Sequence, residues 1–290
     1  MARSFKEAIG SGEFLVTVEI YPPKGTDITP VMSTVKGLEN SISAFGVADN
    51  PRAAMAMSPW ALACLIQESG REAIMHLSCR DRNRMALQSD LLGAASLKIH
   101  NVLCVSGDHV SFGDHIDAKP VHDLDSVQLL QVVHGLANGR DMAGNALSGK
   151  PEFCIGAVAN PESNPLPPQL LKLKKKLEVG VDFIQTHPVF DLEKLGPFLD
   201  EARKKGAKIL AGVRLLVPEE VSRYRDGGYP GLFVPEELLS EIESGGIQKG
   251  VETAARLIRS IKEKGLSDGV HISAPGHEEK ILDIIKAAGV

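Results

Sequence analysis

The chain is poor in cysteine and in aromatic residues. Its 290 residues include four cysteines and one tryptophan, and aromatic residues make up 4% of the sequence. The cysteines, at positions 64, 79, 104 and 154, are widely spaced and form no C-x-x-C pair. This spacing argues against a disulfide framework, a zinc ribbon or an intrinsic iron–sulfur cluster, so we expect reduced thiols in a protein core.

Long apolar runs and an excess of basic charge are missing as well. The longest uncharged runs are too short to span a bilayer, and the opening segment MARSFKE lacks the apolar core of a signal peptide. A formal net charge of −5 gives no basic footprint of the kind that binds nucleic acid. These absences predict a cytoplasmic protein that binds neither membranes nor nucleic acid.

Two familiar kinds of ligand motif are also absent. Without a G-x-G-x-x-G or a Walker pattern, any nucleotide would have to be held by loops and helix N-termini. The spacing of His109, His115 and His122 fits no metallohydrolase pattern. We therefore expect no metal site.

The pattern that is present is an alternation of strand-length apolar runs with segments of helical period. A short helix ending near Gly10 precedes the first run. The predicted strands are Phe14–Tyr21, Ser43–Ala48, Ala73–Cys79, Asn101–Ser106, Glu152–Val158, Phe183–His187, Lys208–Val213 and Gly269–Ser273. The predicted helices between and after them are Asp27–Glu39, Ser58–Glu68, Arg82–Leu97, Ser126–Leu136, Pro168–Val179, Leu192–Lys205, Val251–Lys264 and Glu278–Ala288. Eight such units predict a single α/β domain over residues 1–290, a (β/α)8 TIM barrel, with a doubly wound sheet as the alternative.

Polar residues gather after the ends of these predicted strands, where (β/α)8 barrels place their functional residues. The clusters are Glu19–Lys24, Asp49-Asn50, His76–Asp81, Gly107–His109, Asn160–Asn164, Gln185–His187 and Gly276-His277. Two longer loops run from Asp108 to Leu124 and from Asp226 to Pro235, the second with the sequence Gly-Gly-Tyr-Pro-Gly.

Glu19 is unusual because it interrupts a strand-like apolar run. Alternation puts Val16, Val18 and Ile20 on one face of the strand and turns Glu19 towards the other face. Removed from water, this carboxyl would have a raised pKa, as a general acid working near neutral pH requires. A purely structural carboxylate would need a cationic partner, and the strand alone leaves both interpretations open.

Two further features have a structural and a functional interpretation. The helix that contains Leu173-Lys-Lys-Lys-Leu177 has an apolar stripe of leucines at positions 170, 171, 173 and 177. Its lysines are either surface charges or, for one of them, a contact to a phosphate at the barrel mouth. Gly107-Asp108 is either a tight turn or a close backbone approach followed by an acid in the site.

Taken in order along the chain, several motifs resemble the methylenetetrahydrofolate reductase family. They are VEIYPPKGTD, HLSCRDRNRMALQSDLLGA, NVLCVSGDH, KPVHDLDSVQLL, MAGNALSG, FCIGAVANPESNP, LKLKKKLEVGVDFIQTHPVFD and GLFVPEELL. Each is weak alone, but their order over essentially the whole chain is specific. The length resembles the short bacterial catalytic barrel, in particular that of anaerobes with one-carbon metabolism.

The resemblance implies a barrel that binds FAD at the carboxyl ends of its strands and reduces 5,10-methylenetetrahydrofolate to 5-methyltetrahydrofolate, or runs the reverse oxidation. This reaction belongs to one-carbon metabolism and methionine biosynthesis. NADH or another donor would supply the electrons, directly or through a partner subunit, and we expect an oligomer. Glu19 falls on the family's general acid, and Asp108 on the aspartate that tunes the flavin and hydrogen-bonds the pterin.

The resemblance also assigns binding residues. Those for the cofactor are Asp49, His76, Ser106, Gly107, Asp108, Asn160, Asn164, Lys175 and Lys176. Those for the substrate are Asp108, Gln185, His187 and His277. Departures from the family pattern stand at Ala48, Asn160, Asn164, His187, Glu219 and His277.

Two alternative functions remain open at this point. Other pterin-binding barrels are methyltransferases and also place acids and asparagines at strand ends. The departures at Ala48, Asn160 and His187 are compatible with a non-catalytic folate-binding or partner subunit that has lost the flavin.

Overall fold

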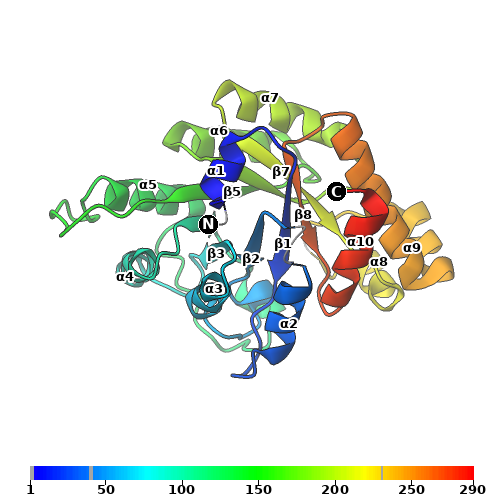
Figure 1. Ribbon diagram of the computed structural model, residues 1–290, viewed down its shortest axis with the longest axis horizontal. Coiled ribbons are helices and arrows are strands. Elements are labelled where there is room, and N and C mark those ends of the chain that lie inside the picture. Colours follow the sequence, from blue (N-terminus) through cyan, green and yellow to red (C-terminus); the bar gives the residue numbers. More distant parts are fainter. Residues whose placement is uncertain (1–2, 39–41, 230) are drawn as a thin grey trace.

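Eight parallel strands close into a barrel in the order of the chain (Figure 1). The computed structural model describes residues 3–38, 42–229 and 231–290. The strands are β1 (Leu15–Ile20), β2 (Ala44–Val47), β3 (Ala73–Ser78), β4 (Asn101–Val105), β5 (Cys154–Ala159), β6 (Phe183–Pro188), β7 (Lys208–Arg214) and β8 (Gly269–Ser273). The pairing of β1 with β8 closes the sheet, so the predicted (β/α)8 barrel is confirmed and the doubly wound alternative is wrong.

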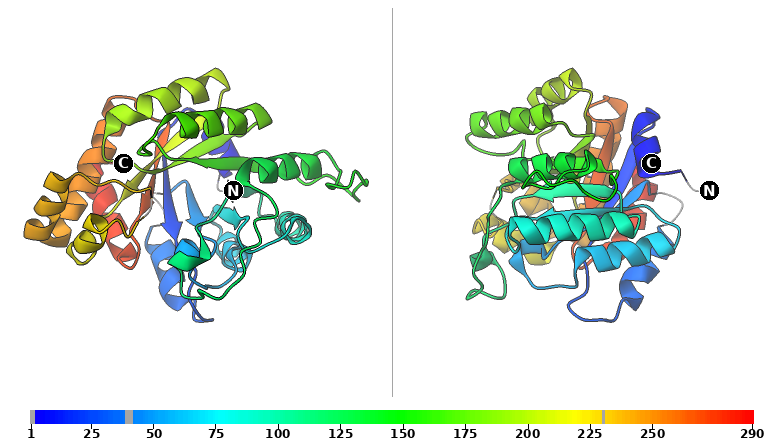
Figure 2. Two further views of the ribbon diagram at one scale, coloured as in Figure 1. Left: turned by 180° about the vertical axis from the view of Figure 1, so that it is seen from behind. Right: turned by 90° about the vertical axis from the view of Figure 1, so that its left-hand side faces the viewer.

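Helices follow the strands and cover the outside of the barrel (Figure 2). They are α1 (Phe5–Gly10), α2 (Thr29–Gly37), α3 (Pro59–Glu68), α4 (Arg84–Ser96), α5 (Ser126–Ala137), α6 (Pro167–Val179), α7 (Gly196–Lys204), α8 (Val221–Arg225), α9 (Glu236–Glu263) and α10 (Ile281–Ala288). Short 3-10 turns are η1 (Pro51–Ala53), η2 (Val110–Phe112), η3 (Leu192–Leu195), η4 (Pro218–Glu220) and η5 (Glu278–Lys280). Two predicted residues, Glu39 at the end of a helix and Pro230 in a loop, lie outside the described residues.

The helix predicted from Val251 is longer than its sequence pattern indicates, because α9 begins at Glu236. Gly246 interrupts it with φ 70°, a value outside the helical range, and this kink hides the first half of the helix from a periodicity search. Helix α8, which precedes it, is also not predicted. Both elements stand at the same edge of the barrel, after β7 (Figure 1).

Side-chain caps explain where several helices begin. Ser4 and Glu7 form a capping box at α1, and Asp125 and Gln128 form another at α5. The Asn83 side chain accepts hydrogen bonds from two backbone amides at the start of α4. Between α5 and β5, residues 138–153 project from the barrel as a hairpin-like loop in which Arg140 pairs with Ala146 (Figures 1 and 2).

The amino-terminal end of the barrel is closed by apolar side chains. Leu15, which faces inward, packs in one buried cluster with Phe5 and Phe183. The Phe5 ring meets the Phe183 ring edge to face, with centroids 5.4 Å apart. Burial of a phenylalanine side chain contributes about 1.5–3 kcal/mol, so α1 is held as a plug. The carboxyl ends of the strands are thereby left as the end that can admit a ligand.

Above this apolar plug the barrel interior is polar. Thr17, His76, Gln185 and His271 are all buried there. The Thr17 hydroxyl lies 3.0 Å from Nδ1 of His271, and the two histidine ring centroids are 6.3 Å apart. A polar layer beneath an open strand end is suited to binding a ligand with hydrogen-bonding edges.

Gly46 on β2 makes room for the two histidine rings. A Cβ atom at this position would lie 2.8 Å from Nε2 of His76 and 3.1 Å from Cε1 of His271. Both atoms belong to buried rings, so neither can move without displacing its neighbours. Glycine is therefore required at position 46 because the two rings approach its backbone closely, and not because the chain turns there.

Gly46→Ala is expected to lower the free energy of unfolding by about 1–3 kcal/mol, because it overpacks this layer. The matched control is Gly93→Ala, inside α4 near its carboxyl end, where a Cβ would meet nothing within 4 Å. That change should stabilise the protein by about 0.5–1 kcal/mol through helix propensity. Urea unfolding measures the free energy of unfolding of both variants. If Gly46→Ala were as stable as Gly93→Ala, the two histidine rings would be able to separate at no cost.

Candidate active site

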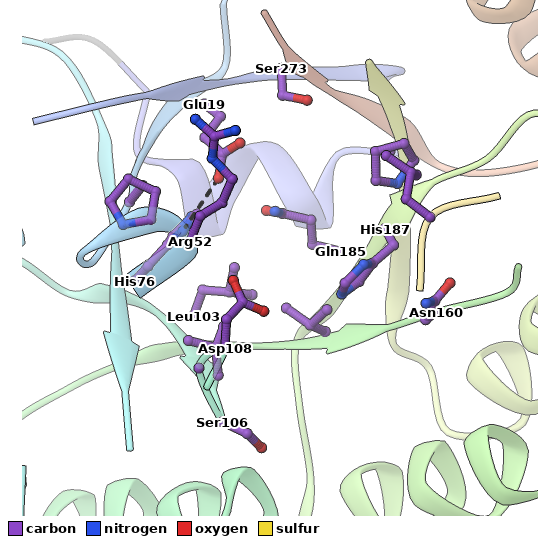
Figure 3. A pocket seen from close by; sticks show the side chains of 18 of the residues that line it. Glu19, Arg52, His76, Leu103, Ser106, Asp108, Asn160, Gln185, His187 and Ser273 are labelled. Atoms are coloured by element: carbon purple, nitrogen blue, oxygen red, sulfur yellow. Dashed lines mark ion pairs between the residues drawn. The ribbon is translucent and has the colours of Figure 1, made fainter. Parts of the chain in front are cut away.

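A cavity of about 460 Å³ opens at the carboxyl ends of the strands (Figure 3). Its volume lies within the range of small-molecule and cofactor pockets. The predicted site residues that line it are Glu19, Asp49, His76, Ser106, Gly107, Asp108, Asn160, Lys176, Gln185 and His187. The polar clusters after separate strands therefore meet in one place, as the barrel topology requires.

Glu19 points into this cavity from β1. Its side chain is 21% exposed, and its Oε2 accepts a hydrogen bond of 2.5 Å from the Tyr21 hydroxyl. Burial raises the pKa of the carboxyl, opposed by the Tyr21 hydrogen bond and by the charge of Arg214. Among the described residues, no lysine or arginine forms an ion pair with it. The cationic partner that a structural carboxylate needs is therefore missing.

Nδ1 of His76 lies 3.9 Å from Oε1 of Glu19 (Figure 3). Burial lowers the pKa of His76 to about 4. Burial and the neighbouring His76 lower the pKa of His271 to about 3. Both rings are therefore neutral at pH 7, and neither stabilises the ionised form of Glu19. A protonated carboxyl at this position is the form that a general acid uses.

Three buried polar atoms in the cavity have no hydrogen-bond partner among the residues that the structure describes. They are Nε2 of His76, Nε2 of His271 and Oε1 of Gln185. An unsatisfied buried polar group costs about 1–3 kcal/mol, so such groups call for a bound partner. The cavity floor thus presents hydrogen-bonding positions to a ligand.

Asp49 and Arg80 hold the strand-end loops together. The two terminal guanidinium nitrogens of Arg82 donate to the Asp49 carboxylate, at 2.6 and 3.2 Å, and the Ser78 amide donates to it at 2.8 Å. Arg80, 2% exposed, donates to the backbone carbonyl of Asp108 at 3.3 Å. Asp49 lines the cavity, but its charge is already matched by an arginine.

Gly107 positions Asp108 at the mouth of the cavity. Its φ is 86°, and a Cβ would lie 2.2 Å from Oγ of Ser78 and 2.9 Å from Cβ of Arg80. Only glycine fits this conformation and this gap. Asp108 follows as an exposed acid, and its charge contributes to the raised pKa of Glu19.

Of the two lysines of α6 expected at the site, Lys176 lines the cavity and Lys175 does not. Lys176 is buried, and its Nζ donates a 2.5 Å hydrogen bond to the carbonyl of Val158. Lys172 lines the cavity as well, whereas Lys175 is exposed and does not. The expected leucine stripe is also wrong at Leu171, which is 57% exposed. Successive residues of a helix point about 100° apart, so the Lys175 side chain leaves the helix in a direction far from that of Lys176.

Two other predicted site residues do not line the cavity. Asn164 is exposed at the start of the segment leading to α6. His277 lies beyond the end of β8, with its Nδ1 3.9 Å from Oε1 of Glu279. Asn160 does line the cavity, and its Nδ2 donates to the Gly231 carbonyl at 2.7 Å. In this loop, the residue nearest the strand reaches the site and the one further along does not.

Arg214, the last residue of β7, was not among the predicted site residues. It lies one residue beyond the predicted end of that strand, on the inward face with Gly212 and Leu210. Its Nη2 donates to the Glu220 carboxylate at 3.0 and 3.3 Å, and its Nε lies 2.6 Å from the Tyr224 hydroxyl. If the predicted strand is extended by one residue, the alternation of its side chains turns Arg214 inward, and this signal could have identified it.

Burial and charge suit this cavity to proton transfer on a bound ligand. Burial lowers the pKa of His187 at the mouth of the cavity. Burial and the charge of Lys172 lower the pKa of Lys176 to about 8.

Within the described ranges, no group of three or more His, Cys, Asp or Glu side chains is arranged to hold a metal ion. The described helices also include none that combines the length and apolarity a membrane span needs.

Fold and site together define a (β/α)8 barrel protein with a polar cavity at the carboxyl ends of its strands, into which the partly buried acid Glu19 points. The family model described as methylenetetrahydrofolate reductase matches residues 4–289. The chain belongs to this family, as its ordered motifs predicted.

The curated relatives are distant and longer. A protein of Caenorhabditis elegans, named as a probable methylenetetrahydrofolate reductase (NADPH), is 23% identical over 240 residues, covering 79% of this chain and 34% of its own. Methylenetetrahydrofolate reductase 2 of Schizosaccharomyces pombe is 24% identical over 315 residues, covering 98% and 47%. The chain thus spans between a third and a half of the length of these two relatives.

Solved structures share the fold at low identity. A protein from Clostridium thermocellum that binds two copies of 5-methyl-5,6,7,8-tetrahydrofolic acid has a TM-score of 0.67 at 16% identity, over 98% of this chain and 97% of that one. The EDTA monooxygenase EmoA from Chelativorans sp. BNC1 has a TM-score of 0.62 at 13% identity, over 96% and 93%. At these identities the likeness concerns the fold alone.

Proposed function

We propose that this protein is a flavin-dependent oxidoreductase that reduces 5,10-methylenetetrahydrofolate to 5-methyltetrahydrofolate, or runs the reverse oxidation. The observation that carries the proposal is Glu19, an acid in the cavity with a raised pKa and no cationic partner within ion-pair distance among the described residues. Membership in the methylenetetrahydrofolate reductase family and the family names of the curated relatives support the same reaction.

Glu19 supplies the proton that this reaction requires. The methylene group bridges two nitrogens of the folate, and one of them must leave before the carbon can accept a hydride. The Glu19 carboxyl protonates that leaving nitrogen and opens the bridge to an iminium. Its Oε2 is held by the Tyr21 hydroxyl, so the proton is presented from Oε1. Asp108, at the mouth, accepts hydrogen bonds from the adjacent N–H groups of the pterin.

The residues of the cavity fit FAD as the hydride source. Bound FAD would supply the hydride that reduces the iminium carbon. Lys172 and Lys176 on the cavity side of α6 would hold its phosphates, and Gly107 leaves the backbone open to close approach. The unpartnered Nε2 of His76 and Oε1 of Gln185 provide hydrogen-bonding positions for the ring edges of cofactor and substrate.

The visible spectrum of the purified protein, followed by anaerobic addition of NADH, tests the proposal. We expect bound flavin that NADH bleaches and that 5,10-methylenetetrahydrofolate reoxidises. Flavin that only dithionite bleaches, and that the folate still reoxidises, would assign the electrons to a different donor or a partner subunit. A colourless protein that binds 5-methyltetrahydrofolate and cannot be reconstituted with FAD would overturn the proposal.

A further inference from the structure

Arg214 lies in the same layer of the barrel as Glu19, with β8 between their strands. Arg214 of β7 is opposite Ser273 of β8. Val18 of β1 is opposite Ile272 of β8, and the next residue on each of these strands is Glu19 and Ser273. The acid is therefore level with both. All three residues line the cavity, and Cα atoms of β1 and β7 come within 8 Å of each other. Because Ser273 is small, the cation and the acid are within reach of one another.

A cage of side chains after β7 holds the Arg214 guanidinium. Its Nη2 donates to both oxygens of Glu220, at 3.0 and 3.3 Å, and its Nε donates to the Tyr224 hydroxyl at 2.6 Å. The guanidinium carbon lies 5.1 Å from the centroid of the Tyr229 ring, a distance at which the ring face attracts it. Among the described residues, Nη1 has no hydrogen-bond partner and Arg214 forms no ion pair with Glu19.

The residues of the cage are themselves held in place. The Tyr224 hydroxyl donates to Glu220 at 3.2 Å, and the Tyr229 hydroxyl donates to the same carboxylate. The two tyrosines pack in a buried apolar cluster with Leu216 and Val221, separate from the main core of the barrel. Glu220 therefore balances the charge of Arg214 from within a packed segment that contains none of the predicted site residues.

Arg214 is also the cation among the groups that face Glu19. The titratable side chains around the acid are Tyr21, His76, Asp108, Arg214, His271 and Glu278. On the other side, β2 places the uncharged Gly46 opposite Glu19. Both histidines are neutral at pH 7, whereas an arginine keeps its charge. Whether Glu19 keeps its proton therefore depends on how well the charge of Arg214 is matched elsewhere.

We propose that Glu220 is a positioning residue for the acid: by binding Arg214 it keeps this cation from pairing with Glu19, so that Glu19 retains its proton. The inference rests on the proposed function, in which Glu19 is the proton donor. Without Glu220, the free Nη1 of Arg214 gains a carboxylate partner in Glu19. An opposite charge within about 4–6 Å lowers the pKa of a carboxyl by about 1–3, so the acid would lose its proton at a lower pH.

The test is a titration of the Glu19 carboxyl, followed by NMR of the side-chain carboxyl carbons and assigned by the signal that Glu19→Gln lacks. In Glu220→Gln, the midpoint should fall by about 1–3 pH units. The falling limb of the pH profile for folate reduction should move to lower pH by the same amount. At a pH above both midpoints, this shift lowers the rate by about tenfold for each pH unit.

The double variant Arg214→Met/Glu220→Gln separates the effect of charge from that of structure. It removes the cation together with its carboxylate, so the midpoint should return to the wild-type value or rise above it, and the rate should recover. A merely structural role of Glu220 predicts no recovery, because the double variant removes more of the cage. Glu219→Gln is the matched control, since it removes the same charge from the adjacent exposed position of η4 and should leave the midpoint unchanged.

A milder variant covers the case in which Glu220→Gln does not fold, since that change leaves the buried Arg214 without its carboxylate. Tyr224→Phe removes the partner of Arg214 Nε and keeps the charge of Glu220. It should lower the midpoint in the same direction as Glu220→Gln, but by less.

A midpoint that stays at the wild-type value in both Glu220→Gln and Tyr224→Phe would overturn the inference. A double variant whose midpoint stays as low as that of Glu220→Gln would overturn it as well. The titration needs neither folate nor an electron donor. A wild-type protein that gives the expected titrations and reduces no 5,10-methylenetetrahydrofolate would overturn the proposed function, while the part of Glu220 in keeping the proton on Glu19 would stand.

Discussion

Replacing Glu19 with glutamine is expected to lower the rate of folate reduction by about 10²–10⁴-fold, the usual contribution of a positioned general acid. Glutamine keeps the size of the side chain and a carbonyl oxygen that can accept from the Tyr21 hydroxyl, but it has no acidic proton to give. Flavin reduction by the donor needs no proton on the folate and should change little. Stopped-flow measurement of the two half-reactions separates them.

The pH dependence of the wild-type rate follows from the surroundings of Glu19. Burial raises the pKa of its carboxyl, so the acid form persists to higher pH than for a free glutamate. The rate of folate reduction should be highest below this pKa and fall as pH rises through it. The glutamine variant should lack that falling limb, because the titrating group is gone.

Stability gives an independent check on the same variant. A carboxyl with a raised native pKa favours the folded state when protonated, and this advantage is lost as pH rises from the unfolded pKa through the folded one. Above that range, Glu19→Gln should unfold at the same or a higher urea concentration than the wild type. A loss of activity therefore cannot come from unfolding.

Glu219→Gln is the matched control for charge at this end of the barrel. Glu219 is exposed after β7 and does not line the cavity, although the sequence places it near a position that covers the folate in some family members. Its activity should stay within about twofold of wild type, as exposed charges contribute little. If Glu19→Gln retained most of its folate reduction while Glu219→Gln lost it, the acid would have to be sought in the segment that follows β7.

The barrel could be predicted from the sequence because strand-length apolar runs and helical periods alternate cleanly. β8 runs over the predicted residues Gly269–Ser273, and β1 differs from its prediction by one residue at each end. The prediction failed where backbone geometry overrides composition. The kink at Gly246 interrupts the helical period of α9 in the sequence. Helix α8, only five residues long, is too short to show a period.

The site was predictable where it depends on strand ends, and less so where it depends on which way a side chain points. Glu19 and His187 line the cavity because inward-facing positions alternate along a strand. His271 was hidden because an inward histidine looks like any other strand residue. Arg52 reaches the cavity from a turn with left-handed φ, which no composition pattern indicates. The roles assigned to these residues stay predictions until the variants are measured.

The two lysines of α6 that line the cavity provide the second large effect, on flavin affinity. Lys172→Met and Lys176→Met are each expected to raise the dissociation constant of FAD about tenfold or more, because each removes a cation that lines the cavity. Lys175→Met removes the same charge from the exposed face of the helix and should change the constant less than twofold. Quenching of flavin fluorescence on binding measures all three.

Lys176 also gives flavin binding a pH dependence of defined sign. Burial and the charge of Lys172 lower its pKa to about 8, so the ammonium loses its proton as pH rises through that value. The affinity of the wild-type protein for FAD should fall over the same pH range. Lys176→Met should bind FAD more weakly at pH 7, and its affinity should not fall further over that range. Methionine removes the buried charge together with its hydrogen bond to the Val158 carbonyl, so urea unfolding of the variant is measured beside FAD binding. If Lys175→Met weakened FAD binding as much as Lys172→Met does, the phosphates would have to lie on the outer face of α6, and the cavity would be the wrong site for the cofactor.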